Sequence, residues 1–113
     1  MKRKKKRPSG IVVDEAMLAR VRAMPCDICC DSSTWKKRDA HHIMARQMGG
    51  GRRLDIKENL LSVCHLYCHE RASQLKRDVQ FALAAERENM TAAECRETVE
   101  RWLRPKHIRE GTA

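Results

Sequence analysis

The feature that most constrains the fold of this chain is two pairs of closely spaced cysteines. Cys26 and Cys29 are separated by two residues, and Cys64 and Cys68 are separated by three. A chain of 113 residues fits one domain, and a domain of this size often needs a metal or disulfides to support a modest core. The basic N-terminus is followed by no apolar run, so we expect no signal peptide, no oxidising compartment and reduced thiols.

This spacing of cysteines predicts a structural zinc site. Structural zinc takes four ligands in a tetrahedron, commonly as two cysteine pairs that each come from one turn. We therefore expect one structural Zn²⁺, held by Cys26, Cys29, Cys64 and Cys68. Cys30 in place of Cys29 and His65 in place of Cys64 are alternatives, and buried thiols without a metal are the plainest one. Cys95 stands alone and is expected to be a small buried apolar group.

Positive charge is unevenly distributed along the chain, whose net charge is +9. Residues 1–7 hold six basic groups and no acidic group, and residues 34–57 hold seven basic and two acidic groups. Such clustering favours a polyanionic partner, in particular nucleic acid, although any one of these groups can simply be surface charge. The residues expected to contact phosphates are Lys2, Arg3, Lys4, Lys5, Lys6, Arg7, Lys36, Lys37, Arg38, Arg46, Arg52 and Arg53. For the basic tail, a solubility or localisation signal is the alternative.

The chain reads as a disordered tail over residues 1–10 and a single domain over residues 11–113. Within that domain we expect a core over residues 26–88 and a C-terminal helix over residues 91–104. No apolar stretch approaches the roughly 20 residues that a membrane helix requires, so a soluble protein is expected.

Hydrophobic periodicity predicts the order helix, strand, loop, strand, helix, helix. The expected elements are a helix capped by Asp14 and stopped by Pro25, strands over Thr34–Ile43 and Asn59–Val63 with a glycine loop at residues 49–51, a helix from about His65, and a helix from a capping box at Thr91 to Pro105. The side chains expected to face the core are Met17, Val21, Met24, Ala72, Leu75, Val79, Leu83, Val99, Trp102 and Leu103.

The adjacent histidines His41 and His42 are harder to explain by structure alone. Neighbouring side chains in a strand point to opposite faces, so one imidazole can hold a metal while the other addresses something else. His69 can return to His41 from the following helix. Asp39 lies on the same strand face as His41, and we expect it to hydrogen-bond that ring.

The run from Cys26 to His69 resembles the HNH endonuclease family, which has a treble-clef or ββα-metal core. The resemblance is carried by Ala40-His41-His42-Ile43, a glycine-rich loop, Asn59-Leu60-Leu61 and Cys64-His65-Leu66-Tyr67-Cys68-His69. It covers a little under half of the chain, and the short basic form resembles small phage-encoded members. It implies an α+β fold: a zinc-clamped ββα-metal core flanked by an N-terminal helix and two C-terminal helices.

The resemblance also implies a role for each matching residue. His42 takes the place of the general base, and His41 and His69 take the places of the ligands of a catalytic divalent cation, Mg²⁺, Mn²⁺ or Ni²⁺. Asn59 matches the family asparagine, which holds the loop of the general base or contributes to the metal site. One departure is the three residues between Cys64 and Cys68, where the family usually has two. This departure creates His65-x-x-x-His69, so His65 is a candidate third ligand, with solvent exposure as the default.

The function that we expect is metal-dependent hydrolysis of double-stranded DNA, leaving 5′-phosphate and 3′-hydroxyl ends. The resemblance implies a phage or prophage protein in the cytoplasm of a bacterial host, with phage packaging proteins as candidate partners. The alternative is a non-catalytic zinc module that binds nucleic acid, and an RNA nuclease is a third choice. Aromatic residues are few, so single-stranded recognition by base stacking is less favoured.

Overall fold

The computed structural model describes residues 12–44 and 53–103. The predicted tail, the glycine loop, Arg46 and Arg52 lie outside these residues. The helices of the described part are α1 (Glu15–Arg22), α2 (Tyr67–Gln74), α3 (Arg77–Glu88), α4 (Ala92–Leu103) and the short 3₁₀ helix η1 (Lys57–Asn59), and the strands are β1 (Arg38–His42) and β2 (Leu60–Cys64). No helix within these ranges is both long and apolar enough to cross a membrane. Mixed helices and a small antiparallel sheet make this an α+β fold, as predicted.

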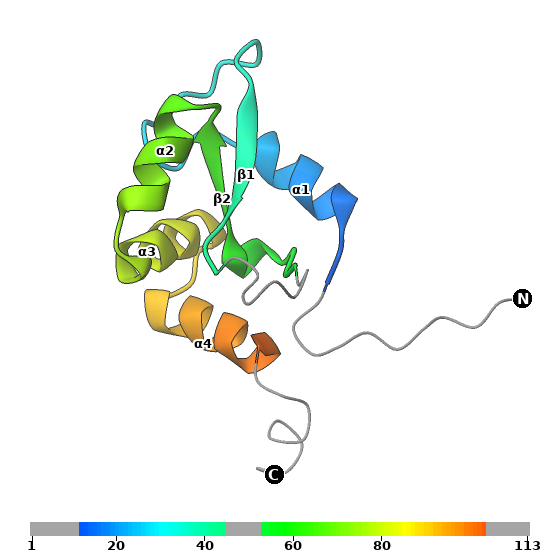
Figure 1. Cartoon of the computed structure of the whole chain (residues 1–113), viewed down its shortest axis with the longest axis vertical. Coiled ribbons are helices and arrows are strands. Elements are labelled where there is room, and N and C mark those ends of the chain that lie inside the picture. The colour runs from blue at the N-terminus through cyan, green and yellow to red at the C-terminus, as the bar shows by residue number, and fades with distance from the viewer. Residues whose placement is uncertain (1–11, 45–52, 104–113) are drawn as a thin grey trace, which may run out of the picture.

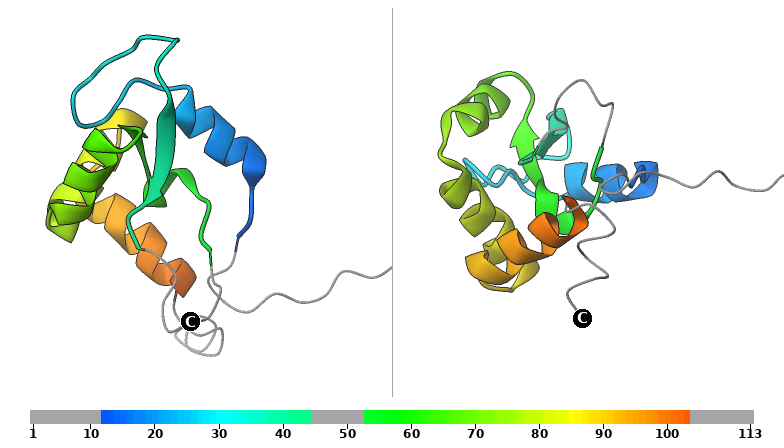
Figure 2. Two further views of the ribbon diagram at one scale, coloured as in Figure 1. Left: turned by 45° about the horizontal axis from the view of Figure 1, so that its top comes forward. Right: turned by 60° about the horizontal axis from the view of Figure 1, so that its bottom comes forward.

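The two strands pair antiparallel, with Ala40 opposite Ser62 and His41 opposite Leu61. Figure 1 shows α1 on one side of this hairpin and α2 and α3 on the other, and Figure 2 shows the same arrangement from two further directions. Because side chains alternate along a strand, Ala40 and Leu60 pack toward α1, whereas Leu61 and Val63 pack toward α2 and α3. The hairpin is thus covered on both faces, which agrees with five buried residues in a row in β2.

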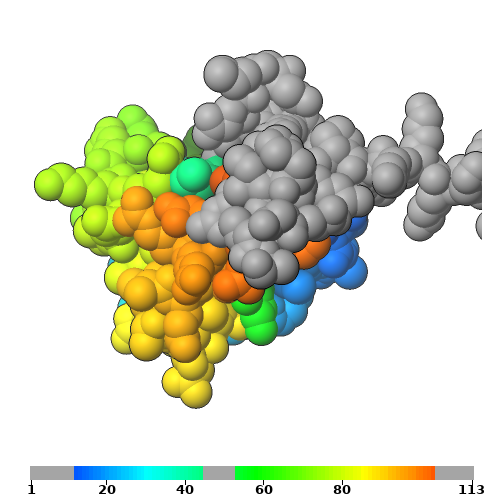
Figure 3. All heavy atoms as spheres, turned by 90° about the horizontal axis from the view of Figure 1, so that it is seen from below, coloured from blue at the N-terminus to red at the C-terminus, as the bar shows by residue number. Residues whose placement is uncertain are grey.

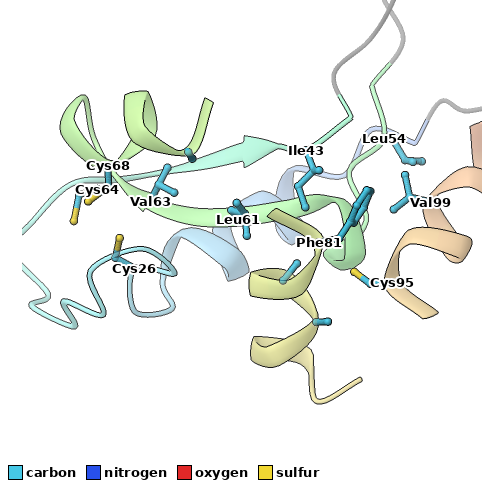
Figure 4. Close-up of a cluster of buried hydrophobic side chains, with 13 residues drawn as sticks. Cys26, Ile43, Leu54, Leu61, Val63, Cys64, Cys68, Phe81, Cys95 and Val99 are labelled. Atoms are coloured by element: carbon cyan, nitrogen blue, oxygen red, sulfur yellow. The ribbon is translucent and has the colours of Figure 1, made fainter. Parts of the chain in front are cut away.

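The larger core lies between the hairpin, α3 and α4. Phe81 from α3 lies close to Leu54 and Val99, and the same apolar cluster continues along β2 to the cysteines at its other end (Figure 4). In the view from below, the side chains of α4 (orange) lie near the centre of the visible surface (Figure 3). Each large side chain buried in this way contributes about 1.5–3 kcal/mol, so this packing fixes the strand that ends at Cys64.

Local signals at two helix ends are confirmed. The carboxylate of Asp14 accepts a hydrogen bond from the backbone N–H of Met17 at 3.1 Å, so Asp14 caps α1. At the start of α4, Glu94 accepts from the N–H of Thr91 at 2.9 Å and its own N–H donates to the Thr91 hydroxyl at 3.0 Å. This reciprocal pair is the predicted capping box.

Other predicted elements are corrected by the structure. The strand predicted from Thr34 begins only at Arg38, because Asp31 accepts hydrogen bonds from the Ser33 N–H and the Lys36 ammonium group and holds the preceding residues in a loop. The helix predicted from His65 divides into α2 and α3, since the chain is extended at Leu75 and Lys76.

The division of this helix shifts the buried face. Val79, predicted to be buried, is 44 % exposed, while Gln80 and Phe81 are buried in its place. Trp102 was also predicted to face the core and is 38 % exposed. Val99 and Cys95, one and two turns before it, fill that part of the core.

A buried ionic network joins α3 to the rest of the molecule. The Arg87 guanidinium donates to Asp27 at 2.6 Å, to Glu88 at 2.8 Å and to the Lys57 carbonyl at 2.8 Å. The Asp27 carboxylate also accepts the backbone N–H of Ser62 from β2 at 2.8 Å. Arg87 therefore fixes the turn that carries Cys26 against β2 and the adjoining 3₁₀ helix.

Candidate functional site

Four cysteines gather at the end of β2. The sulfur atoms of Cys26, Cys29, Cys64 and Cys68 lie within 4.8 Å of one another, and among the described residues this is the one group of three or more His, Cys, Asp and Glu side chains placed to hold a metal ion. Figure 4 shows the sulfurs of Cys26, Cys64 and Cys68 turned toward one another. The cluster contains Cys29 and Cys64, as predicted, and it does not contain the alternatives Cys30 and His65. Such a cluster of thiols is compatible with metal binding.

Backbone geometry brings the first pair together. The thiol sulfur of Cys26 accepts the backbone N–H groups of Ile28 and Cys29, each at 3.4 Å. Cys30 follows with a φ of 65°, in the left-handed region, and its N–H donates to the Cys26 carbonyl at 2.9 Å. These bonds close the chain into a turn that aims both sulfurs at β2.

The second turn accounts for the extra residue between Cys64 and Cys68. Leu66 has a φ of 73° and a ψ of −75°, and the Tyr67 N–H donates to the His65 carbonyl at 2.9 Å. These values define a γ-turn, whose positive φ is strained for any residue with a side chain. The turn absorbs one residue, so α2 begins at Tyr67 and Cys68 still returns to Cys64.

The crowded thiols influence one another's ionisation. Burial raises the pKa of Cys64 to about 11 and that of Cys68 to about 12, and the neighbouring sulfurs Cys26 and Cys29 add to both shifts. For Cys26 burial acts in the same direction, but backbone N–H donors outweigh it and lower the pKa to about 7. Four thiolates in this space need a cation to compensate their charge.

His41 lies on the face of β1 that α2 and α3 cover. Its Nε2 is 2.9 Å from the side-chain oxygen of Gln80, whose amide nitrogen donates to the Leu75 carbonyl at 2.9 Å. Because the second bond fixes the amide, Nε2 of His41 must be the donor, and the lone pair is left on Nδ1. Burial lowers the pKa of His41, the hydrogen bond to Gln80 opposes this shift, and the nearby His69 and His42 lower the pKa further, so the balance favours the neutral ring.

His69 meets His41 from α2. Their ring centroids are 5.1 Å apart, with the planes at 79°. Nδ1 of His69 lies 2.9 Å from Asp39, and Nδ1 of His65 lies 2.9 Å from the same oxygen. Asp39 is thus a partner of His69 and His65, and the prediction that it would hydrogen-bond His41 is wrong. The cause is that Gln80 occupies Nε2 of His41 while Asp39 faces the start of α2.

The charge on Asp39 follows from these bonds. Burial alone would raise its pKa, but hydrogen bonds and opposite charge from His65 and His69 outweigh burial and bring the pKa below its ordinary value. An ionised Asp39 accepts only, so Nδ1 of His69 donates and the lone pair of that ring is on Nε2. His65 is half exposed, and the contact described for its ring is with the Asp39 carboxylate.

His42 lies on the opposite face of β1, as strand alternation predicts. Its Nε2 is 2.8 Å from the carboxylate of Asp55, which is buried. Sequence reasoning missed Asp55. The available signal was weak, namely an acidic residue between the apolar Leu54 and Ile56 in an otherwise basic segment.

Asn59 is completely buried next to this site. Its side-chain oxygen accepts the Met44 N–H at 2.8 Å, and its amide group donates to the carbonyls of Met44 and Leu54 at 3.2 and 3.0 Å. The side chain therefore joins the residues just after β1 to those before η1, and holds the His42 end of the hairpin.

Several basic residues expected to contact phosphates are occupied elsewhere. Arg38 is buried and donates to the carbonyls of Arg22 and Asp31, both at 3.2 Å, so its predicted phosphate contact is wrong. Lys36 is paired with Asp31 at 3.0 Å. Arg53 is paired with Glu15 and Asp55, and Lys37 is exposed. The charge of residues 34–57, here called the β1 segment, is therefore used partly to hold the fold.

No family model, curated protein or solved structure matches this chain.

Proposed function

We propose that this protein is a metal-dependent DNA endonuclease of the HNH type, with a treble-clef core and a structural zinc on the four cysteines. The observation that carries the proposal is the contact between the rings of His41 and His69, with His42 next to His41 on the other face of β1. Each of the three rings has one nitrogen fixed by a partner, an arrangement that metal-ligating and catalytic histidines share.

The residues fit a divalent cation at His41 and His69. The lone pairs assigned above, on Nδ1 of His41 and Nε2 of His69, are those that a metal would use, and the neutral state of His41 suits a ligand. Asp39 fixes His69 and adds negative charge nearby. Imidazole ligands suit nickel better than magnesium or manganese, which prefer oxygen ligands. We therefore expect Ni²⁺ to support activity at lower concentration than Mg²⁺.

The residues of this chain divide the work of phosphodiester hydrolysis. His42 accepts the proton of the attacking water, as a neutral imidazole can near neutral pH. Asn59 keeps the end of the hairpin in place. When bound, the cation supplies stabilisation of the charge that develops on the phosphate and the leaving 3′ oxygen. The products are a 5′-phosphate and a 3′-hydroxyl.

Duplex DNA is the substrate class that the charge supports. The net charge of +9 favours a polyanion, and the described residues contribute Lys37 and Arg71 as exposed bases near β1 and α2. Arg71 lies over the ring of Tyr67, 5.8 Å from its centroid. Such contacts position the backbone of DNA without reading its sequence.

The test is plasmid nicking by the purified, zinc-loaded protein with Mg²⁺, Mn²⁺, Ni²⁺ or Zn²⁺ added. His42→Ala should abolish nicking yet leave the affinity for the added cation nearly unchanged, whereas His41→Ala and His69→Ala should weaken both. The matched control is His65→Ala, because the ring of His65 is exposed just before α2. This variant should lose less nicking activity and less cation affinity than either ligand variant. Full nicking by His42→Ala would refute the proposal.

One observation favours a second function, a non-catalytic zinc module that binds nucleic acid. Within the described residues only the cysteines have their ligand atoms already within 4.8 Å of one another, and the histidines do not. Such a module would bind DNA with unchanged affinity when both His41 and His42 are replaced by alanine, and would nick under none of the cation conditions. Gel-shift measurements on that double variant therefore separate the two functions.

A further inference from the structure

The carboxylate of Asp55 is the most thoroughly bound side chain near His42. One oxygen lies 2.8 Å from Nε2 of His42 and 3.3 Å from Nε of Arg53. The other accepts the backbone N–H of Asp14 at 2.9 Å and a second guanidinium nitrogen of Arg53 at 2.5 Å. The side chain has no solvent exposure, compared with 25 % for that of His42.

This arrangement fixes the tautomer of His42. Backbone N–H and guanidinium groups can only donate, so both Asp55 oxygens must accept, and an ionised carboxylate can do nothing else. Hydrogen bonds from Arg53, Asp14 and His42 outweigh burial and hold the pKa of Asp55 below its ordinary value. The proton of the neutral imidazole therefore lies on Nε2, and the lone pair lies on Nδ1. Among the described residues, none is hydrogen-bonded to Nδ1 of His42.

Asp55 is also held so firmly that it can direct the ring. Its own N–H donates to the Val12 carbonyl at 2.8 Å, and Leu54 before it is buried and pairs with Val12. The base of a general-base reaction must be kept in one orientation and one protonation state, because the lone pair has to face the water. A fixed carboxylate behind the ring provides both.

We propose that Asp55 is the positioning residue of His42, holding the ring in the Nε2–H tautomer and directing Nδ1 at the attacking water. This inference rests on the proposed function of His42 as the general base. The competing explanation is that Asp55 merely ties Arg53 and the start of α1 to the core, in which case His42 would keep its tautomer without it.

The test is Asp55→Asn in the full chain with zinc bound, and its readout is the tautomer of His42 by long-range ¹H–¹⁵N NMR, at a pH where the ring is neutral and with no added cation. The Asp14 N–H and the guanidinium nitrogen of Arg53 that lies 2.5 Å away must still donate to one side of the new amide, whereas the other side loses only the 3.3 Å contact with Nε of Arg53, so the NH₂ group turns toward His42. His42 then becomes an acceptor at Nε2 and carries its proton on Nδ1. The chain has five histidines, and the signals missing from His42→Ala identify the ring.

We expect the unmodified protein to show Nε2–H and Asp55→Asn to show Nδ1–H, with single-turnover nicking reduced by about 10²- to 10⁴-fold and zinc content unchanged. An unshifted tautomer in Asp55→Asn overturns the proposal, whatever happens to the rate. If that variant fails to fold, the unmodified protein decides, because an Nδ1–H tautomer there overturns the proposal as well. Full nicking by His42→Ala would refute the proposed nuclease function. The tautomer measurement tests the role of Asp55 separately.

Discussion

At the scale of single residues, Leu66 shows how the chain accommodates its unusual cysteine spacing. The γ-turn at Leu66 places a branched residue at a φ of 73°, which costs of order 1–3 kcal/mol. Its side chain is 70 % exposed and so regains little of that cost by packing. The turn between Cys64 and Cys68 is therefore strained in a way that a single substitution can relieve.

Leu66→Gly is expected to stabilise the protein. Glycine removes the strain, and its greater freedom in the unfolded chain costs only about 0.5–1 kcal/mol, which leaves a net gain of about 1 kcal/mol. The melting temperature of the zinc-saturated protein should rise by roughly 5 °C. Leu66→Ala is the matched control, because it removes the same side chain and keeps the strain. A glycine variant that melts below the alanine variant would show that Leu66 is not strained.

The sulfur cluster gives a second prediction at this scale. Cys26→Ser should release about one zinc per chain and unfold the protein, since the binding energy of a structural zinc is folding energy. Cys95→Ser should retain zinc, because Cys95 lies in α4 and its thiol donates only to the Glu58 carbonyl at 3.1 Å, as a hydroxyl also can. Elemental analysis and circular dichroism measure both. A well-folded, active preparation without zinc would contradict the structural site.

The residues that sequence reasoning found and missed differ in one respect. The cysteines and His41, His42 and His69 are recognisable by type and spacing. Asp55 and Gln80 are not, because what makes each important is a contact across the fold with a ring that lies far away in the sequence. Asp39 was found but assigned the wrong partner. Strand alternation predicts which face of the sheet a side chain lies on, but it does not predict which residue contacts it there.

At the scale of elements, local signals predict where a helix begins better than where it ends. Asp14 and the Thr91 box act within one turn, so the sequence is sufficient to place them. The break between α2 and α3 contains neither glycine nor proline. The Leu75 carbonyl is satisfied by the side chain of Gln80, which in turn binds His41, so this break depends on a tertiary contact.

Arg87 is the residue through which α3 is fixed to its neighbours, and Arg87→Ala tests that role. Its guanidinium and the carboxylates of Asp27 and Glu88 are all nearly buried. Removing the cation leaves the buried carboxylate of Asp27 without a positive partner, whereas Glu88 keeps its ion pair with Arg20. We expect a loss of about 3–5 kcal/mol of unfolding free energy in zinc-saturated protein. The control is Arg101→Ala, whose pair with Glu97 is exposed and should contribute at most about 1 kcal/mol. Chemical unfolding measures both, and similar losses would contradict the network.

At the scale of the whole molecule, the distribution of charge shifts the proposed DNA binding toward the tail. Arg38 is buried, and Lys36 and Arg53 are paired with acidic residues, so fewer bases remain on the β1 segment than the sequence suggests. Residues 2–7 still supply six positive charges. Counting basic residues predicts a polyanionic partner, but it cannot tell which of these residues the fold buries or pairs with acidic groups.

Deleting residues 2–7 should weaken DNA binding on every sequence and flatten its dependence on salt. Each neutralised phosphate adds roughly 0.9 to the slope of log affinity against log salt, so six contacts add at most about 5. Single-turnover nicking at saturating DNA should stay within a fewfold of the intact protein. Fluorescence anisotropy over a salt series gives the slope, and an unchanged slope would mean that the tail serves solubility or localisation.

The bridge between Val12 and Leu54 determines where that tail is attached. Val12 donates to the Arg53 carbonyl at 2.7 Å and accepts from the N–H of Asp55 at 2.8 Å, so the described chain begins next to the residue that is hydrogen-bonded to His42. Five residues of extended chain span at most about 18 Å, which corresponds to roughly five base pairs along a duplex. For the proposed nuclease, a tether of this length would raise the local concentration of duplex DNA at the hairpin. The same six charges joined to the end of α4 would bind the proposed DNA substrate equally well, but they would favour its cleavage less.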